Sequence, residues 1–268
     1  KINSYLISAV FKTHHPFFRW YGGIFRKSLK TFTELYLQDE ESGRLIEKIG
    51  VTNFKVMGDT RFDRVLEIKN NLTELPLIAS FKGNSKIIVA GSTWDKDDSL
   101  VIGAFELLGD TKVKLILVPH DVDERAINET IAKVQKTKLS YSLFTDAVPN
   151  NSQVLIVNTM GLLSKIYHYA DCSYIGGGFN GGLHNCLEAS VYGKPITFYG
   201  KDYVKYNETF DLLKIQAATV VENEKELSNS FRNYLSESFN NEELANRLDA
   251  YFQDKSNAVG KILDDIQL

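Results

Sequence analysis

The stretch Ile87-Ile88-Val89-Ala90-Gly91-Ser92-Thr93 decides the fold class, because a short apolar run ends there in a glycine and two hydroxyl side chains. The same order returns at Leu115-Ile116-Leu117-Val118 and at Val154-Leu155-Ile156-Val157, each followed by a polar turn and a helical pattern. Apolar runs without alternation are typical of parallel strands that are covered on both faces. Residues 81–268 are therefore predicted to form a Rossmann-like α/β lobe, with ligands expected at the carboxyl ends of its strands.

The residues before this lobe predict part of another one. Apolar strands at 5–11, 35–37 and 54–57 alternate with helical patterns at 18–32 and 39–49, which gives the order β-α-β-α-β. We expect three parts: the rear of an amino-terminal lobe in residues 1–60, a linker in 61–80, and the carboxyl-terminal lobe with its final helices in 81–268. Two full lobes need roughly 400 residues. The 268-residue chain, which does not begin with Met, is therefore expected to be a fragment.

The composition excludes several classes of protein. With 43% hydrophobic and 24% charged residues and a mean hydropathy of −0.20, the chain is neither disordered nor a disulfide scaffold. Its longest apolar runs are strand-sized and fall short of the ~20 residues that cross a bilayer. The net charge of −3 argues against a nucleic-acid-binding protein. Only two cysteines, Cys172 and Cys186, indicate a reducing compartment.

The first 33 residues are nevertheless basic. They hold no acidic side chain and six basic ones: Lys1, Lys12, Arg19, Arg26, Lys27 and Lys30. Such a segment suits an anionic membrane surface or an anionic small substrate. A solvated helix face accounts for the charges equally well, so charge alone leaves these alternatives open.

The most conspicuous motif is glycine-rich, since five of the seven residues 176–182 are glycine. Gly176-x-Gly178-x-x-Gly181 matches the dinucleotide fingerprint, but that fingerprint belongs to the first strand–helix turn of its fold, and three such units precede it here. We therefore reject NAD binding. Glycines at this density still indicate a backbone that approaches a ligand closely and offers N–H groups to an anion.

Polar residues around this motif suit a nucleotide-like ligand. Glu188, one turn into the next helix, can accept two hydrogen bonds from a sugar diol. His184 and Asn185 can donate to phosphate or carboxylate, although Asn185 is equally suited to cap the helix. The Ser92-Thr93 turn and the loop Asn158-Thr159-Met160-Gly161 fall at the same predicted edge, where helix capping is again the simpler explanation for each alone.

No metal site, serine-hydrolase motif or phosphate-binding P-loop is predicted. The five histidines are scattered along the chain, and neither cysteine pairs with another ligand at a metal-binding interval.

Taken together, these motifs resemble the 3-deoxy-D-manno-octulosonic acid (Kdo) transferases. The matching stretches are Val56-Met57-Gly58-Asp59-Thr60-Arg61-Phe62-Asp63, Ala90-Gly91-Ser92-Thr93, Leu115 to His120, Asn158 to Gly161, Tyr169-Ala170-Asp171, Gly176 to Ala189, Gly193-Lys194-Pro195 and Tyr206-Asn207. Their order and spacing hold from about residue 5 to the end of the chain. The set is specific, although no single piece of it is.

The resemblance implies a GT-B fold and transfer of Kdo from CMP-Kdo to a lipid A precursor in lipopolysaccharide biosynthesis, with inversion and without a metal or other cofactor. It implies a location at the cytoplasmic face of the bacterial inner membrane, on an anionic surface. The implied donor-binding residues are Ser92, Thr93, Pro119, His120, Met160, Gly161, Gly177, Gly178, His184, Asn185, Glu188 and Asn207. The general base is expected upstream of Lys1, so we expect the 268 residues alone to be inactive in transfer.

Three positions depart from the family pattern. Trp94 stands where many members have histidine, His120-Asp121 where they have Arg-His, and Leu162 where they have glutamate. Each puts one donor contact in question. Two alternatives stay open: another GT-B enzyme, such as a UDP-sugar epimerase or glycosyltransferase, and a non-catalytic nucleotide-binding module.

Overall fold

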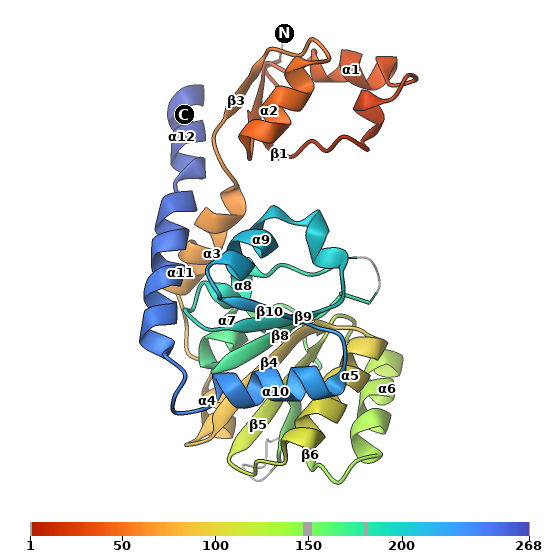
Figure 1. Ribbon diagram of the computed structural model, residues 1–268, viewed down its shortest axis with the longest axis vertical. Coiled ribbons are helices and arrows are strands. Elements are labelled where there is room, and N and C mark those ends of the chain that lie inside the picture. Colours follow the sequence, from red (N-terminus) through yellow and green to blue (C-terminus); the bar gives the residue numbers. More distant parts are fainter. Residues whose placement is uncertain (1, 147–151, 180–181, 268) are drawn as a thin grey trace. The chain divides into compact units, whose positions relative to one another are not determined.

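The computed structural model describes residues 2–146, 152–179 and 182–267 (Figure 1). The chain divides into two compact units, which are treated one at a time. The first consists of Lys1–Leu66 together with Tyr251–Leu268, and the second of Glu67–Ala250. Within the described residues, no helix combines the length and the apolar character that a membrane span requires.

The second unit is built on a sheet of seven parallel strands, which confirms the predicted α/β class. The strands lie in the order β10-β9-β8-β4-β5-β7-β6. Their bounds are β4 Lys86–Thr93, β5 Val113–Pro119, β6 Tyr141–Leu143, β7 Val154–Ile156, β8 Cys172–Ile175, β9 Ile196–Tyr199 and β10 Ala218–Val221. Every residue of β7 and β8 is buried, because helices cover both faces of a parallel sheet.

Helices cover the sheet from two sides (Figure 1). The bounds are α4 Pro76–Lys82, α5 Asp95–Leu108, α6 Glu124–Gln135, α7 Leu163–Ile166, α8 Leu187–Ser190, α9 Asn207–Lys214 and α10 Glu224–Tyr234, with 3-10 turns at Tyr167–Tyr169 and Asp202–Lys205. Figure 1 shows α5, α6 and α10 on one side of the sheet and α7, α8 and α9 on the other. The core on the α5 side joins aliphatic residues of β4 and β5 to Leu227 and Phe231 of α10.

The strand order fixes where a ligand can bind. The central strand β4 has β5 on one side and β8 on the other, so the chain leaves β4 in one direction and later returns to its opposite flank. Open α/β sheets bind ligands at such a switch point, beyond the carboxyl ends of the strands. The loops after β4, β5 and β8 therefore form the expected site.

The first unit holds a three-stranded parallel sheet, β1 Tyr5–Ala9, β2 Glu34–Leu37 and β3 Phe54–Val56, in sequence order. Its helices are α1 Gly23–Leu29, α2 Glu40–Glu47, the first part of α3 Thr60–Asn70, the end of α11 Asn241–Lys255, and α12 Ala258–Ile266. A small core of Phe11, Leu29, Leu35, Leu37, Ile46 and Val51 lies between sheet and helices.

The carboxyl-terminal end differs from the prediction, which placed residues up to 268 in the donor lobe. Residues 251–268 instead belong to the first unit, where the Tyr36 hydroxyl and the Lys55 ammonium both donate to Asp265 of α12. Asp63 caps α12 by accepting from the backbone N–H groups of Asn257 and Val259 at 2.6 and 3.2 Å. The predicted linker is also helical, since α3 and α4 occupy much of residues 61–80.

The helix predicted over residues 18–32 is shorter than its apolar spacing suggests. A 3-10 turn at Pro16–Phe18 precedes a bend, and α1 begins only at Gly23. At Gly22 a Cβ would lie 2.3 Å from the carbonyl oxygen of Pro16, so the bend requires glycine there. Arg26 fixes the bend by donating to the carbonyls of Phe17 and Arg19.

Candidate functional site

Three loops at the switch point bring together aromatic rings that are far apart in the sequence. Trp94 follows β4, His120 follows β5, and His184 comes after the glycine-rich loop that follows β8. The His120 ring stacks on Trp94 at 4.4 Å and on His184 at 4.7 Å between ring centroids. The Trp94 indole Nε1–H donates to Nε2 of His184 at 3.0 Å. The structure thus unites the predicted residues His120 and His184 around a residue that departs from the family pattern.

Asp97 holds the base of this cluster. Its side chain is fully buried in the first turn of α5. One carboxylate oxygen accepts from the backbone N–H groups of Trp94 at 3.1 Å and Gly177 at 2.9 Å, and the other accepts from the Tyr174 hydroxyl at 2.6 Å. A single carboxylate therefore ties the starts of the β4 and β8 loops to strand β8.

Three consecutive glycines at the start of the β8 loop are required by the chain's own packing. A Cβ would lie 2.2 Å from the carbonyl oxygen of Ser92 at Gly176, 2.2 Å from that of Gly182 at Gly177, and 2.1 Å from that of Tyr199 at Gly178. These glycines let β4, β8 and β9 approach closely at their ends. Close packing accounts for these three glycines, and the predicted donor-binding role of Gly177 and Gly178 stays a prediction.

Gly176→Ala is expected to lower the free energy of unfolding by about 3 kcal/mol, because its Cβ would meet backbone that cannot move aside. Gly161→Ala is the matched control. Nothing lies within 4 Å of a Cβ there, so only the positive φ of 82° opposes it, at a cost of about 1 kcal/mol. Urea unfolding of both variants measures the difference, and equal losses would contradict the packing role.

Glu188 lies near the start of α8, where Asn185 Nδ2 donates to Oε1 at 3.3 Å. Burial raises the pKa of the Glu188 carboxyl, and the hydrogen bond from Asn185 lowers it in part. The carboxylate also contributes to raising the pKa of Tyr192 to about 12, although burial is the larger cause. Asn185 is a neutral donor, and this partly buried carboxylate is suited to other neutral donors such as sugar hydroxyls.

The other predicted residues occupy different environments. Thr93 is only 2% exposed, and it lines a cavity of about 110 Å³ with Trp94, Asp98 and Thr130. Pro119 is buried beside it. Ser92 is partly exposed with a φ of 52°, and Gly177 and Gly178 are buried in the loop described above. Met160, Gly161 and Asn207 are exposed, in the loop after β7 and at the start of α9.

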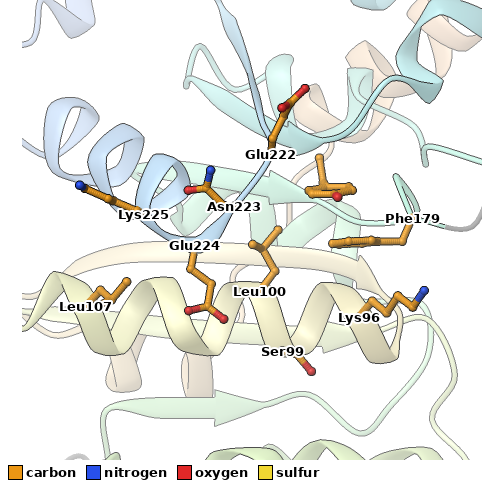
Figure 2. Close-up of a pocket in the computed structure, with 10 residues that line it drawn as sticks. Lys96, Ser99, Leu100, Leu107, Phe179, Glu222, Asn223, Glu224 and Lys225 are labelled. Carbon is orange, nitrogen blue, oxygen red and sulfur yellow. The ribbon is translucent and has the colours of Figure 1, made fainter.

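A cavity of about 580 Å³ lies apart from these residues, on the α5 side of the sheet (Figure 2). Figure 2 shows Leu100 and Leu107 of α5 facing Asn223 and Glu224 at the start of α10. Phe179 and Tyr199, which also line the cavity, stack at 3.6 Å between centroids. None of the predicted donor-binding residues lines it.

The described part of the chain contains no group of three His, Cys, Asp or Glu side chains placed to hold a metal ion. Cys172 and Cys186 are both free and buried. The loops at the switch point also offer backbone N–H groups, which are neutral donors of the kind that can bind an anion.

Sequence reasoning missed Trp94 and Asp97 as parts of the site. The run Asp95-Lys96-Asp97-Asp98 is the first turn of α5. The sequence did contain a signal for this helix start. Asp97 lies three residues after Trp94, the residue that precedes α5, and an acidic residue at this spacing is typical of a helix capping box.

Comparisons with known proteins support the predicted resemblance. No family model matches the chain. A bifunctional glycosyltransferase/methyltransferase from Fusobacterium nucleatum is 26% identical over 86% of this chain and 37% of its own length. A 3-deoxy-D-manno-octulosonic acid transferase from Rickettsia bellii is 25% identical over 84% of this chain and 54% of its own length. The chain thus spans about half, or less, of these curated relatives.

Solved structures show the same fold. The C-terminal CMP-Kdo binding domain of WaaA from Acinetobacter baumannii matches with a TM-score of 0.59 and 18% identity, over 72% of this chain and 97% of that one. A UDP-N-acetylglucosamine 2-epimerase from Listeria monocytogenes, assigned that function provisionally, matches with a TM-score of 0.64 and 10% identity, over 98% of this chain and 67% of that one. The chain is therefore a relative of the 3-deoxy-D-manno-octulosonic acid transferases with a GT-B-type α/β fold, as its motifs indicated.

Proposed function

We propose that this chain is the donor-binding part of a glycosyltransferase that transfers Kdo from CMP-Kdo. The observation that carries the proposal is the cluster at the carboxyl ends of β4, β5 and β8, where Trp94, His120 and His184 lie together at a topological switch point. The sequence relatives include several Kdo transferases, and one solved structure of the same fold is a CMP-Kdo binding domain.

The chemistry of the cluster suits departure of CMP. Transfer of the sugar leaves negative charge on the CMP phosphate, which fixed N–H donors in a partly buried site stabilise. His120 and His184 supply ring nitrogens for the phosphate or the Kdo carboxylate, and Glu188 supplies acceptors for the two ribose hydroxyls. Calorimetric titration with CMP and UDP tests this assignment, because a uridine-nucleotide enzyme of the same fold would prefer UDP.

Transfer to a lipid A precursor, inversion at the transferred centre, and a general base upstream of residue 1 are further parts of the proposal. They rest on the motif resemblance alone. Under this proposal the 268 residues alone bind donor and transfer no Kdo. A transfer assay with CMP-Kdo and a lipid A precursor tests this, and robust turnover would contradict it.

We also propose that residues 16–30 contact the anionic cytoplasmic face of the inner membrane. Trp20 is 92% exposed and Ile24 is 74% exposed, and Lys27 and Lys30 are exposed within the same segment. Exposed aromatic and aliphatic side chains beside basic ones are typical of helices that lie in a membrane interface. The hydrogen bonds from the Arg26 side chain to the carbonyls of Phe17 and Arg19 hold this segment in one conformation.

The double change Lys27→Glu with Lys30→Glu is expected to weaken binding to phosphatidylglycerol-containing vesicles by at least about tenfold, since each basic residue near an anionic surface contributes about 1 kcal/mol. Lys136→Glu with Lys138→Glu is the control, because it reverses two exposed charges in the other unit. Vesicle sedimentation measures binding, with pure phosphatidylcholine as the uncharged surface. Equal losses in the two double variants would contradict the proposed membrane contact.

A UDP-sugar enzyme is the second candidate. The fold match to the UDP-N-acetylglucosamine 2-epimerase extends over nearly the whole chain. The sequence relatives favour the first candidate, because several of them are Kdo transferases.

A further inference from the structure

Trp94 and His184 form a hydrogen-bonded pair of nearly coplanar rings. Their planes differ by 18° and their centroids are 6.3 Å apart, while Nε1 of the indole and Nε2 of the imidazole are only 3.0 Å apart. The two rings therefore meet edge to edge. The His120 ring lies against the faces of both, with interplanar angles of 26° and 27°.

This geometry determines where the imidazole carries its proton. An indole N–H can only donate, so Nε2 of His184 must accept and cannot itself hold a proton. The neutral ring then carries its proton on Nδ1. Within the described residues, Nδ1 of His184 makes no hydrogen bond, and it is not among the enclosed polar atoms that lack a partner. It is therefore available to a ligand as a donor.

We propose that Trp94 is a positioning residue that holds His184 in the Nδ1–H tautomer, so that the site presents a fixed N–H donor to an anionic group of the ligand. The inference rests on the proposed function only for the identity of that anion. It assigns a role to Trp94, which departs from the family pattern. The Trp94 indole carries no charge and can donate to His184 at every pH.

The groups around His184 agree with a neutral ring. Burial lowers the pKa of His184, and the neighbouring His120 lowers it further, whereas Asp97 acts in the opposite direction. Protonation of His184 would also place a second donor against the indole N–H and break the hydrogen bond. We therefore expect a neutral His184 at pH 7, with a pKa that rises once the indole donor is removed.

Nitrogen-15 NMR of the imidazole rings tests the tautomer in the chain without any ligand. We expect Nδ1 of His184 to be protonated in the unmodified chain and the Trp94 indole proton to exchange slowly with solvent. In Trp94→Phe, which keeps an aromatic ring against His120, we expect the Nε2–H tautomer to appear and the pKa of His184 to rise. Trp20→Phe is the matched control, because it removes the other indole, which is 92% exposed.

A ligand titration separates this inference from the proposed function. If CMP binds, Trp94→Phe is expected to weaken it roughly fivefold by lowering the fraction of His184 in the competent tautomer, and Trp20→Phe should leave it unchanged. If CMP does not bind, the proposed function fails while the NMR result still tests the tautomer. An Nε2–H tautomer in the unmodified chain, a fast-exchanging Trp94 indole proton, or unchanged His184 signals in Trp94→Phe would overturn the inference.

Discussion

Replacing Asp97 by alanine is expected to lower the free energy of unfolding by about 3–5 kcal/mol. The variant removes the buried carboxylate that accepts hydrogen bonds from the backbone N–H groups of Trp94 and Gly177 and from the Tyr174 hydroxyl. Each buried donor left unsatisfied costs about 1–3 kcal/mol. Nucleotide binding should be lost as well, because the Trp94 and Gly177 loops are no longer tied together.

Two further variants make this expectation specific. Asp97→Asn keeps the size of the side chain but replaces one acceptor oxygen by an NH2 group, which faces hydrogen-bond donors. The free energy of unfolding is therefore expected to fall by about 2 kcal/mol. Asp95→Ala removes a carboxylate from the same helical turn, where it is 72% exposed and pairs with Lys133. That change should cost less than about 1 kcal/mol. Urea unfolding measures all three, and a loss at Asp97 no larger than at Asp95 would contradict the assigned role.

Replacing Glu188 by glutamine is expected to weaken CMP binding by about 10- to 100-fold while leaving the chain as stable as before, or more stable. The proposed bonds from the ribose hydroxyls end on a charged acceptor, and such bonds contribute about 1.5–3 kcal/mol. The same carboxylate is costly without ligand, because it is largely removed from water and receives one long hydrogen bond from Asn185. Opposite signs for binding and stability distinguish a ligand-binding residue from a structural one.

The pH dependence has a definite sign. Since the pKa of Glu188 is raised in the folded chain, the folded state binds a proton more tightly than the unfolded state, and stability falls as pH rises from 4.5 through the folded pKa. Glu188→Gln should lack this component. Its stability advantage should therefore be present at pH 7 and vanish as pH falls below the ordinary glutamate range.

Calorimetry with a modified ligand completes the test of Glu188. CMP without its 2′ and 3′ hydroxyls should bind more weakly than CMP to the unmodified chain and equally to Glu188→Gln. Glu224→Ala, in the separate cavity beside α10, is the control and should not change CMP binding. If removing the hydroxyls weakens ligand binding by the same factor in Glu188→Gln and in the control variant, Glu188 does not bind the ribose hydroxyls.

Much of the fold was predictable because hydrophobic burial determines it locally. The apolar runs that open at Ile87, Leu115 and Val154 are strands of the parallel sheet, as predicted. The short strands β6 and β10 were missed, because three or four residues carry little periodic signal. The placement of residues 251–268 was missed for another reason, since it depends on distant partners such as Asp63 and Tyr36.

The site was predictable as a location and less so as a set of contacts. Parallel topology places the loops after β4, β5 and β8 at one edge, so His120 and His184 could be expected there. The hydrogen bond from Trp94 to His184 joins residues 90 positions apart, and no local pattern indicates it. The glycines of the β8 loop were identified correctly as unusual, yet the contact that requires them is with Ser92, Gly182 and Tyr199.

Isothermal titration calorimetry of the 268-residue chain with CMP-Kdo, CMP, UDP and UDP-N-acetylglucosamine tests the central claim most directly. We expect the two cytidine ligands to bind at least tenfold more tightly than the two uridine ligands, with the binding heat strongly reduced in Glu188→Gln. A preference for UDP would contradict the claim in favour of a UDP-sugar enzyme, and the absence of binding to any of the four ligands would contradict it outright.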